Sequence, residues 1–343
     1  MADYTTIDDP SAYFQTALYT GNAGTQTITN DGNSDLQPDF LWFKERSVTG
    51  NHQLINTVSG INKKLMSNST ATEGTQTNYV TAIGSDSFSI GNNNGINQNS
   101  VTNVCWQWKA GTAASGNTSG SGTAKTFSSS SSSTAGFSIV KYVGNGTSNH
   151  AIPHGCGAAP TMVIVKTTTK SSQAWPVDNR QISGVMYLDE TGAAGAYGND
   201  NPFTSVAPTS SVFSVGSPGN TNYNDDTYIA YCFAEVKGYS KFGFYIGNGN
   251  ADGTFIYLGF KPAFLMVKLS SATDDWQILD NKRNPFNIMD KYLRPNSNGS
   301  TVTNAVVDFV SNGFKLRSSA GSWNPSGETA IYMAFAENPF VTS

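Results

Sequence analysis

The side chains that could do metal chemistry in this chain are few and scattered. His150 and His154 lie on either side of Ile152-Pro153, and in an extended segment both would project to the same side. Two histidines at that spacing could ligate a metal ion, but no cysteine or carboxylate cluster with ligand spacing accompanies them. We therefore favour solvated loop histidines over a metal centre, and we predict no metal and no other cofactor.

Carboxylates are the second group that could do chemistry, because glycoside hydrolysis needs two of them about 5–10 Å apart. Adjacent pairs such as Asp189-Glu190 and Asp274-Asp275 are unsuitable, since neighbours along a strand point to opposite faces. Asp178 and Asp280 recur at similar places in two segments, where a third segment has Asn56. That exchange fits a turn better than catalysis, so we predict no catalytic residue and no enzyme activity.

Aromatic side chains are the remaining candidates, because an exposed ring on a polar loop is a good contact residue. Trp323 lies in the polar segment 321–325 and is the leading candidate for binding. Trp175 and Trp276 could also be platforms on which a sugar stacks. Each precedes an aliphatic residue by two positions, which favours packing in a core or between units. The predicted binding residues are these three tryptophans.

The three cysteines, Cys105, Cys156 and Cys232, cannot all pair with one another. Cys105 and Cys232 lie in apolar segments that we place at matching positions of two repeats. A buried, small apolar role is the ordinary one for such residues, and their redox state is left open.

The elements that must position these side chains recur three times. Tyr-x-Gly-Asn occurs at 19–22, 142–145 and 245–248. A run from proline to lysine follows at 38–44, 160–166 and 262–268, with the same spacing of six residues. A repeat of this kind usually builds a scaffold or an array of binding surfaces.

Further landmarks follow each lysine in the same order. The segments 52–56, 175–179 and 276–280 come next, and each repeat closes with an aromatic strand at 104–108, 231–235 or 333–337. The relative register of the closing strands is open by two residues. A slip of two residues keeps every side chain on the same face of a sheet, so the predicted core does not change.

Composition and pattern predict an all-β fold of three tandem antiparallel β-sandwich repeats, jelly-roll-like in type. Charged residues are only 13% of the chain, and short apolar runs alternate with turn signals such as Asn145-Gly146. The predicted repeats span 14–110, 136–238 and 239–343. The best helical candidate is Asn284 to Leu293, which has Pro285 near its start.

The segments outside the repeats carry separate predictions. Residues 111–135 are rich in Gly, Ser and Thr, which predicts a flexible or extended linker that tethers repeat 1 loosely. No such linker separates repeats 2 and 3, so we expect those two to pack as a rigid pair. Residues 1–13 precede the first landmark and are predicted to be an arm that orders against a partner.

Charge and hydropathy exclude several partners. The net charge of −4 offers no basic stripe for phosphates, so we expect no nucleic-acid partner. No apolar run approaches the length of a membrane span, so membrane insertion is not expected. The polar, acidic residues 1–10 do not resemble a secretory signal, which predicts synthesis in a cytoplasm.

The segments 7–16, 18–22 and 38–44, together with the ending at 106–111, resemble a family of proteins encoded by tailed phages of marine bacteria and cyanobacteria. Members usually have a cysteine between the closing tryptophans, whereas this chain has Gln107 there and Cys105 before the pair. The resemblance is clearest over residues 7–111. It implies a virion-structural role in a tail, fibre or head decoration, and it carries over no catalytic residue.

These observations predict a non-enzymatic phage structural protein, located in the virion as a tail-fibre, appendage or capsid decoration component. Residues 1–13 and repeat 1 are expected to dock on other virion proteins. A homo-oligomer is expected, and a trimer is one form considered. The alternative is a carbohydrate-binding protein that recognises a glycan on the host surface, and a polysaccharide depolymerase is less favoured.

Overall fold

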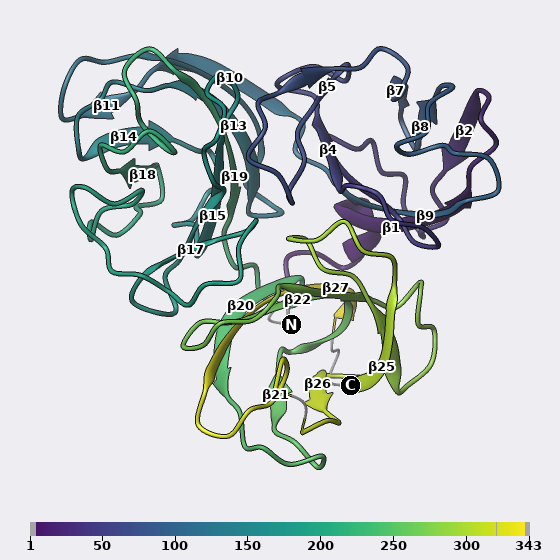
Figure 1. Ribbon diagram of the computed structural model, residues 1–343. Coiled ribbons are helices and arrows are strands. Elements are labelled where there is room, and N and C mark those ends of the chain that lie inside the picture. The colour runs from purple at the N-terminus through teal and green to yellow at the C-terminus, as the bar shows by residue number, and fades with distance from the viewer. Residues whose placement is uncertain (1–4, 320, 340–343) are drawn as a thin grey trace.

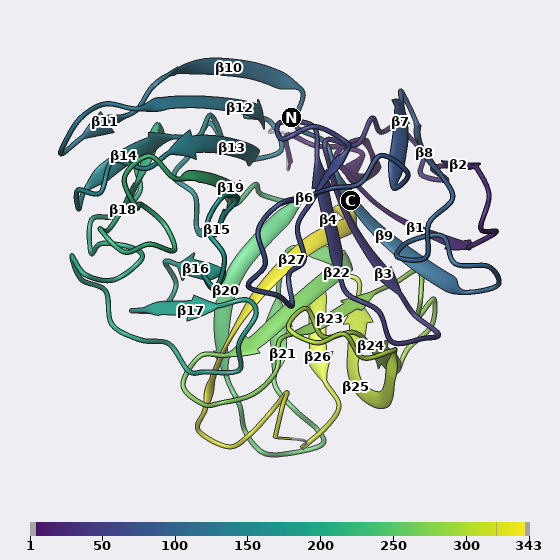
Figure 2. The same cartoon turned by 45° about the horizontal axis from the view of Figure 1, so that its top comes forward.

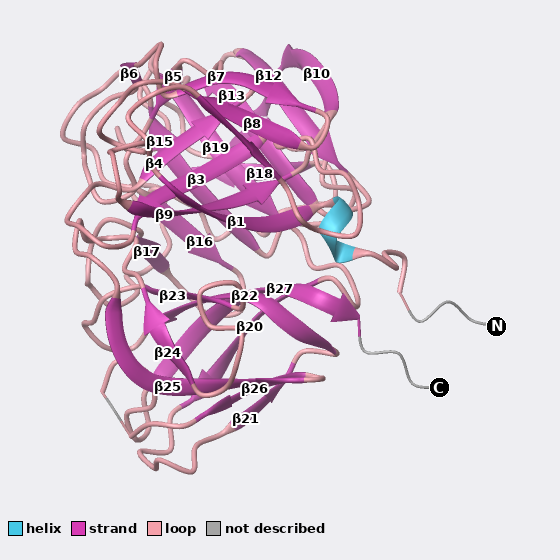
Figure 3. Cartoon of the chain, turned by 90° about the vertical axis from the view of Figure 1, so that its right-hand side faces the viewer, coloured by secondary structure: helices cyan, strands magenta, loops and turns pink. Residues whose placement is uncertain are grey.

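The computed structural model describes residues 5–319 and 321–339, and it confirms an all-β, antiparallel fold of the sandwich class. Among these residues the helical element is a single 3-10 turn, η1 (Pro10–Ala12). Figure 3 shows strands and loops through the rest of the molecule. The helix predicted at Asn284 to Leu293 is wrong, because that segment is a loop followed by strand β24 (Met289–Tyr292).

The sheets form three sets, which we call units 1, 2 and 3. In unit 1, four strands lie in the order β1-β9-β3-β4 and three in the order β2-β8-β7, while β5 and β6 form a small separate ladder. The bounds are β1 (Phe14–Thr20), β2 (Gln26–Thr29), β3 (Phe40–Glu45), β4 (Gln53–Asn56), β5 (Lys63–Lys64), β6 (Gly74–Thr75), β7 (Val80–Gly84), β8 (Ser87–Ile90) and β9 (Thr102–Trp108).

Units 2 and 3 repeat this order, as β13-β19-β15-β16 with β14-β18, and as β20-β27-β22-β23 with β21-β26. In unit 2 the bounds are β13 (Phe137–Val143), β14 (His150–Pro153), β15 (Met162–Thr167), β16 (Pro176–Asn179), β17 (Val185–Tyr187), β18 (Val212–Val215) and β19 (Thr227–Phe233). In unit 3 they are β20 (Ser240–Ile246), β21 (Phe255–Tyr257), β22 (Phe260–Leu269), β23 (Gln277–Asp280), β25 (Val302–Val310), β26 (Gly313–Leu316) and β27 (Thr329–Pro339).

The strand pairing fixes the register that the sequence left open. In every unit the first strand pairs antiparallel with the last, and the matching pairs are Phe14 with Trp108, Phe137 with Phe233, and Ser240 with Phe335. Trp108, Phe233 and Phe335 are therefore equivalent. Cys105 and Cys232 do not match, since they are offset by two positions.

All three units meet in one buried core. Figure 1 shows them as three lobes around a common centre. The ring of Trp108 lies 5.7 Å from that of Phe335 and 6.3 Å from that of Phe233, and the two phenylalanine rings are 6.0 Å apart. The predicted loose tether of repeat 1 is wrong, because one face of its first sheet is apolar and is buried against the other two units.

The segment predicted to be a flexible linker forms strands instead. β10 (Thr112–Asn117) pairs with β12 (Thr126–Ser132), β12 pairs with the edge of β13, and β11 (Ser119–Gly120) pairs with β14. Figure 2 shows β12 and then β10 outside β13 at the periphery of unit 2. The compositional argument failed because an open sheet edge supplies backbone hydrogen bonds to a strand that has few large side chains.

The predicted N-terminal arm packs on its own chain over the residues that the structure describes. Ile7 is 2% exposed in the central core, and the Thr5 hydroxyl donates to the Lys237 carbonyl at 2.8 Å. Asp9 caps η1 by accepting from the Ser11 N–H at 3.0 Å. From residue 5 onward, the arm is thus ordered without a partner.

Candidate functional site

The three tryptophans predicted to bind a ligand are buried. Trp175 is 0% exposed, and Trp276 and Trp323 are each 1% exposed. Trp323 packs edge-on against Tyr292 in the core of unit 3, with ring centroids 5.6 Å apart. None of these rings can stack on a ligand from solvent, so the binding prediction is wrong for all three. Packing, the alternative weighed for Trp175 and Trp276, describes their position.

Trp175 and Trp276 hold neighbouring units together. The Trp175 indole N–H of unit 2 donates to the Met66 carbonyl of unit 1 at 3.0 Å, and that of Trp276 in unit 3 donates to the Tyr187 carbonyl of unit 2 at 2.9 Å. At the matching place in unit 1, His52 Nε2 lies 3.0 Å from the Arg294 carbonyl of unit 3. Unit 2 therefore bonds to unit 1, unit 3 bonds to unit 2, and unit 1 bonds to unit 3, so the three units form a closed ring.

His52 replaces a tryptophan without loss of this contact. Its Nδ1 accepts from the Trp42 indole N–H at 2.9 Å, so the proton lies on Nε2 and can be donated to the carbonyl of Arg294. Burial lowers the pKa of His52 well below its usual value, and the charge of Lys44 lowers it further. The imidazole is accordingly neutral and serves as a structural donor.

Each proline-to-lysine run ends in a buried lysine. Lys44, Lys166 and Lys268 are all 0% exposed, and burial lowers the pKa of each to about 8. The ammonium of Lys44 donates to the Glu45 carbonyl at 2.6 Å. That of Lys166 donates to the Gln173 carbonyl in the following loop, and that of Lys268 donates to the Leu269 and Ala272 carbonyls. The lysines hold these loops in place and are shielded from any substrate.

The two histidines considered for metal binding have protein partners, and the preferred prediction of solvated loop histidines is wrong, because His150 and His154 are 0% and 1% exposed. His150 lies 2.9 Å from the Asn222 side-chain oxygen and 2.6 Å from the Thr118 hydroxyl, while His154 Nε2 lies 3.1 Å from the Thr209 carbonyl. In the part of the chain that the structure describes, no group of three His, Cys, Asp or Glu residues could hold a metal ion.

The recurrent carboxylates are also engaged in structure. Asp178 accepts from Arg180 at 2.7 Å and from the Tyr197 hydroxyl at 2.6 Å. Asp280 accepts from Arg283 at 2.5 Å and from the Trp106 indole at 3.0 Å, so it links unit 3 to unit 1. Both carboxylates are buried, at 1% and 0% exposed, and serve to hold their partners.

An asparagine clasp, not found from the sequence, recurs in all three units. Asn97, Asn222 and Asn324 each accept from the backbone N–H of the asparagine in Tyr-x-Gly-Asn, at 3.0, 2.9 and 2.8 Å. Each also donates to carbonyls of the nearby loops. Their common position, five residues before the closing strand, is the signal that would have revealed them.

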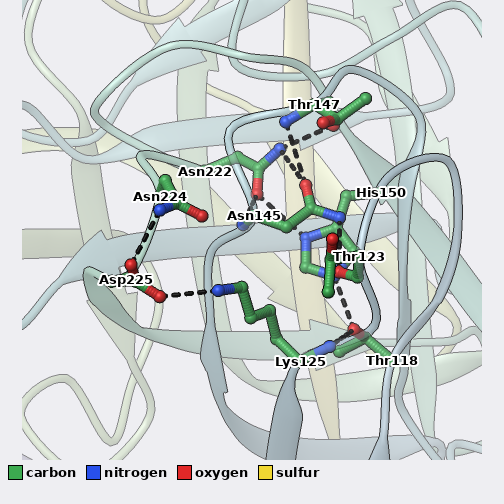
Figure 4. A network of polar contacts seen from close by, with 9 residues as sticks. All are labelled: Thr118, Thr123, Lys125, Asn145, Thr147, His150, Asn222, Asn224 and Asp225. Carbon is green, nitrogen blue, oxygen red and sulfur yellow. Dashed lines mark hydrogen bonds and ion pairs between the residues drawn. The ribbon is translucent and has the colours of Figure 1, made fainter.

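Figure 4 shows the clasp in unit 2, where it also holds the added hairpin. Asn145 donates to the carbonyls of Ser121 and Thr123 at 2.9 and 3.0 Å, and Lys125 forms an ion pair with Asp225 at 2.6 Å. The network ties β10–β12 to the first repeat motif. The polar groups of the network bond to one another, so we interpret it as a structural connection and not as a ligand site.

An open groove lies along the seam of units 1 and 3. Two adjoining cavities of 330 and 440 Å³ share Asn281, Lys282 and Glu337. Phe286 lines the second cavity and is 81% exposed, the highest value among the exposed large hydrophobic residues of the described chain. We call this site the Phe286 groove, with Gln15, Asp31 and Asn33 on the side of unit 1.

The charges of the Phe286 groove neutralise one another. Lys282 pairs with Asp31 across the seam at 2.8 Å, and Lys261 pairs with Glu337 at 2.7 Å. In this way the groove carries two ion pairs, each of one lysine and one carboxylate. It offers amides, balanced charges and one exposed ring, which suits an uncharged polar ligand that has an apolar face.

The fold thus defines a class: an all-β protein whose three sandwich units share one core. A family model described as Domain of unknown function (DUF7483) matches residues 9–339, so the chain belongs to this family. Searches of curated proteins and of solved structures gave no match. Among the described residues, no helix is long and apolar enough to cross a membrane.

Proposed function

We propose that the protein is a non-enzymatic structural component of a phage particle, an appendage or a decoration, that presents a rigid β platform to the host surface. The observation that carries the proposal is the shared aromatic core around Trp108, Phe233 and Phe335, which holds three units as one body. The proposal that this body belongs to a phage particle comes from the sequence resemblance to phage structural proteins.

Docking on the particle is assigned to the surface of unit 1. Ile7 of the arm is buried in the chain's own core, so residues 5–13 would have to leave that core in order to bind elsewhere. Weak contacts between exposed surfaces and the host would gain strength from the number of copies on the particle.

Cryo-electron microscopy of purified particles tests this function. Density that fits the three-lobed body on the head or the tail is expected, together with the chain in the protein inventory of the same particles. Clean particles that lack both the density and the chain would contradict a structural role.

A second candidate function is recognition of an uncharged host glycan, and the Phe286 groove favours it. Sugars present apolar C–H faces that pack on an aromatic ring, and their hydroxyls match side-chain amides such as those of Asn33 and Asn281. The two lysine–carboxylate pairs balance the charge of the groove, which argues against a strongly anionic glycan.

Binding of neutral oligosaccharides from the host surface, followed by saturation-transfer NMR, tests the second candidate. Phe286→Ala should abolish the signal, while Tyr223→Ala, which removes an aromatic residue 53% exposed in unit 2, should not change it. An absence of signal with the wild-type protein, or equal loss in both variants, would exclude the groove as the glycan site.

A further inference from the structure

Unit 3 leaves open a sheet edge that unit 2 covers. The outer edge of β13 pairs with β12 over six residue pairs, and β11 covers the edge of β14. The equivalent strands in unit 3 are β20 and β21. Within the described residues, β20 pairs on one side with β27, and β21 pairs on one side with β26. The first strand of a unit can thus accept an antiparallel neighbour on its outer edge, as β13 accepts β12. Among the described residues, no strand pairs with the outer edge of β20.

Exposed apolar side chains gather on these two strands. Phe244 and Ile246 of β20 are 51% and 56% exposed, and Phe255 and Tyr257 of β21 are 44% and 50% exposed. They are four of the nine exposed large hydrophobic residues in the described chain. On the covered strand β13, the position of Phe244 is taken by Lys141, which lies near Glu73 of unit 1 at 3.8 Å.

Natural edge strands are usually protected by charges, proline or a covering segment, because an open edge invites another strand to pair with it. Lys241 is the one charged residue of β20. The stretch 243–247, which includes the start of the following turn, reads Gly-Phe-Tyr-Ile-Gly and has no charge and no proline. Phe244 and Ile246 lie on one face, since alternate residues of a strand share a face. This edge therefore has the composition of a pairing surface.

The same stretch is complementary to itself. When two copies run antiparallel about Tyr245, Phe244 of one lies opposite Ile246 of the other, and Gly243 lies opposite Gly247. Apolar residues meet apolar residues in directly opposed positions, the pairs that stabilise a sheet, and no like charges meet. A two-fold axis at Tyr245 makes the contact identical for both copies.

The precedent in unit 2 also shows where an added strand goes. In Figure 2, β12 and then β10 lie progressively farther out from β13, at the periphery of the molecule. Because β20 corresponds to β13, an added strand would lie outside β20 as β12 lies outside β13.

We propose that β20 is a docking surface for a second copy of this chain. The two β20 strands pair antiparallel about Tyr245. The β20-β27-β22-β23 sheet of one copy thereby continues into the same sheet of the other copy. The exposed rings of Phe255 and Tyr257 flank the contact. The inference concerns self-association and does not depend on the proposed role in a particle or on the Phe286 groove.

Sedimentation velocity over a concentration series tests the dimer. The wild-type protein is expected to sediment as a dimer, and Phe244→Lys as a monomer with unchanged circular dichroism. The matched control is Leu18→Lys, which places the same charge at the equivalent position of β1, where Leu18 is 38% exposed. The control is expected to remain a dimer.

Cysteine cross-linking tests the register without disturbing the charge. A mixture of Phe244→Cys and Ile246→Cys proteins should form a disulfide-linked dimer on mild oxidation, because these positions are opposed. The native cysteines are all buried and should not react in the folded protein. A wild-type monomer at every concentration, or a dimer that survives Phe244→Lys and gives no cross-link, would overturn the proposal. Pairing of this edge only with a strand of another protein would also overturn it.

Discussion

At the scale of the residue, the clasp asparagines explain why Tyr-x-Gly-Asn recurs. The tyrosine hydroxyls at Tyr19, Tyr142 and Tyr245 donate to a backbone carbonyl next to the clasp asparagine, at 2.6, 2.7 and 2.7 Å. The glycine is needed because a side chain there would collide with the backbone of the facing loop, such as the Gln98 carbonyl at 2.1 Å from a Cβ built on Gly21. The tyrosine, glycine and asparagine of the motif thus all contact one loop, which carries the clasp asparagine far along the chain.

Replacement of a clasp asparagine should be costly. Asn222→Ala removes the bonds donated to the Thr147 and Gly216 carbonyls, the bond accepted from the Asn145 N–H and the contact with His150. It leaves buried backbone groups unpaired, so we expect a loss of about 3 kcal/mol in the free energy of unfolding. Chemical denaturation measures it. Asn224→Ala, at an exposed neighbour in the same network, should cost less than about 0.5 kcal/mol. Equal effects in the two variants would contradict a structural role for the clasp.

The buried lysines should make stability depend on pH. Burial lowers the pKa of Lys166 to about 8, against 10.5 in the unfolded chain, so between these values the unfolded state holds a proton that the folded state lacks. The stability that this group contributes therefore rises with pH across that window. Measured from pH 7 to pH 10, the free energy of unfolding of the wild type minus that of Lys166→Met should increase. A difference that stays constant would show that Lys166 titrates normally.

At the scale of the element, the hairpin β10–β12 shows that sequence composition alone does not decide order. Its residues are mostly exposed and small, yet β12 pairs along the whole edge of β13, and Phe127 packs against the core of unit 2. The main chain obtains its hydrogen bonds from the neighbouring strand, so the hairpin needs few apolar side chains to remain in place.

Limited trypsin digestion should report this order directly. Lys125 is the sole trypsin site between 111 and 135, and its ammonium is paired with Asp225 at 2.6 Å. We expect the native protein to resist cleavage after Lys125 over times that fully digest the urea-unfolded chain, with fragments identified by mass spectrometry. Rapid cleavage of the native protein after Lys125 would contradict the ordered hairpin and would support the flexible linker predicted from composition.

At the scale of the whole molecule, one chain builds a three-lobed ring. Indole or imidazole donors at Trp175, Trp276 and His52 link each unit to the preceding one. The units therefore depend on one another for the burial of their inner faces.

Truncation of a central ring should weaken all three units together. Trp108 is 1% exposed and contacts rings from units 2 and 3, so Trp108→Ala should lower the free energy of unfolding by about 4 kcal/mol. Calorimetry should show one transition in both proteins, shifted to lower temperature in the variant. Two separate transitions in the wild-type protein, or an isolated fragment 1–110 that folds with native stability, would contradict a shared core.

The sequence by itself determined the all-β class, the three repeats and the buried nature of their apolar runs, because alternation and turn residues are local signals that each strand carries. It also favoured packing for Trp175 and Trp276, which the structure places at the contacts between units. Its preferred ligand residue, Trp323, proved to be buried because the polar loop around it folds over the core of unit 3.

Tertiary structure alone decided the shared core, the ordered hairpin, the asparagine clasp and the Phe286 groove. Each depends on residues far apart in sequence, such as Asn145 with Asn222, or Asp31 with Lys282. Which faces meet is set by the closure of the ring, when the inner sheets of three units bury one another. No local pattern encodes that closure, because the same apolar face could equally have been covered by a second chain.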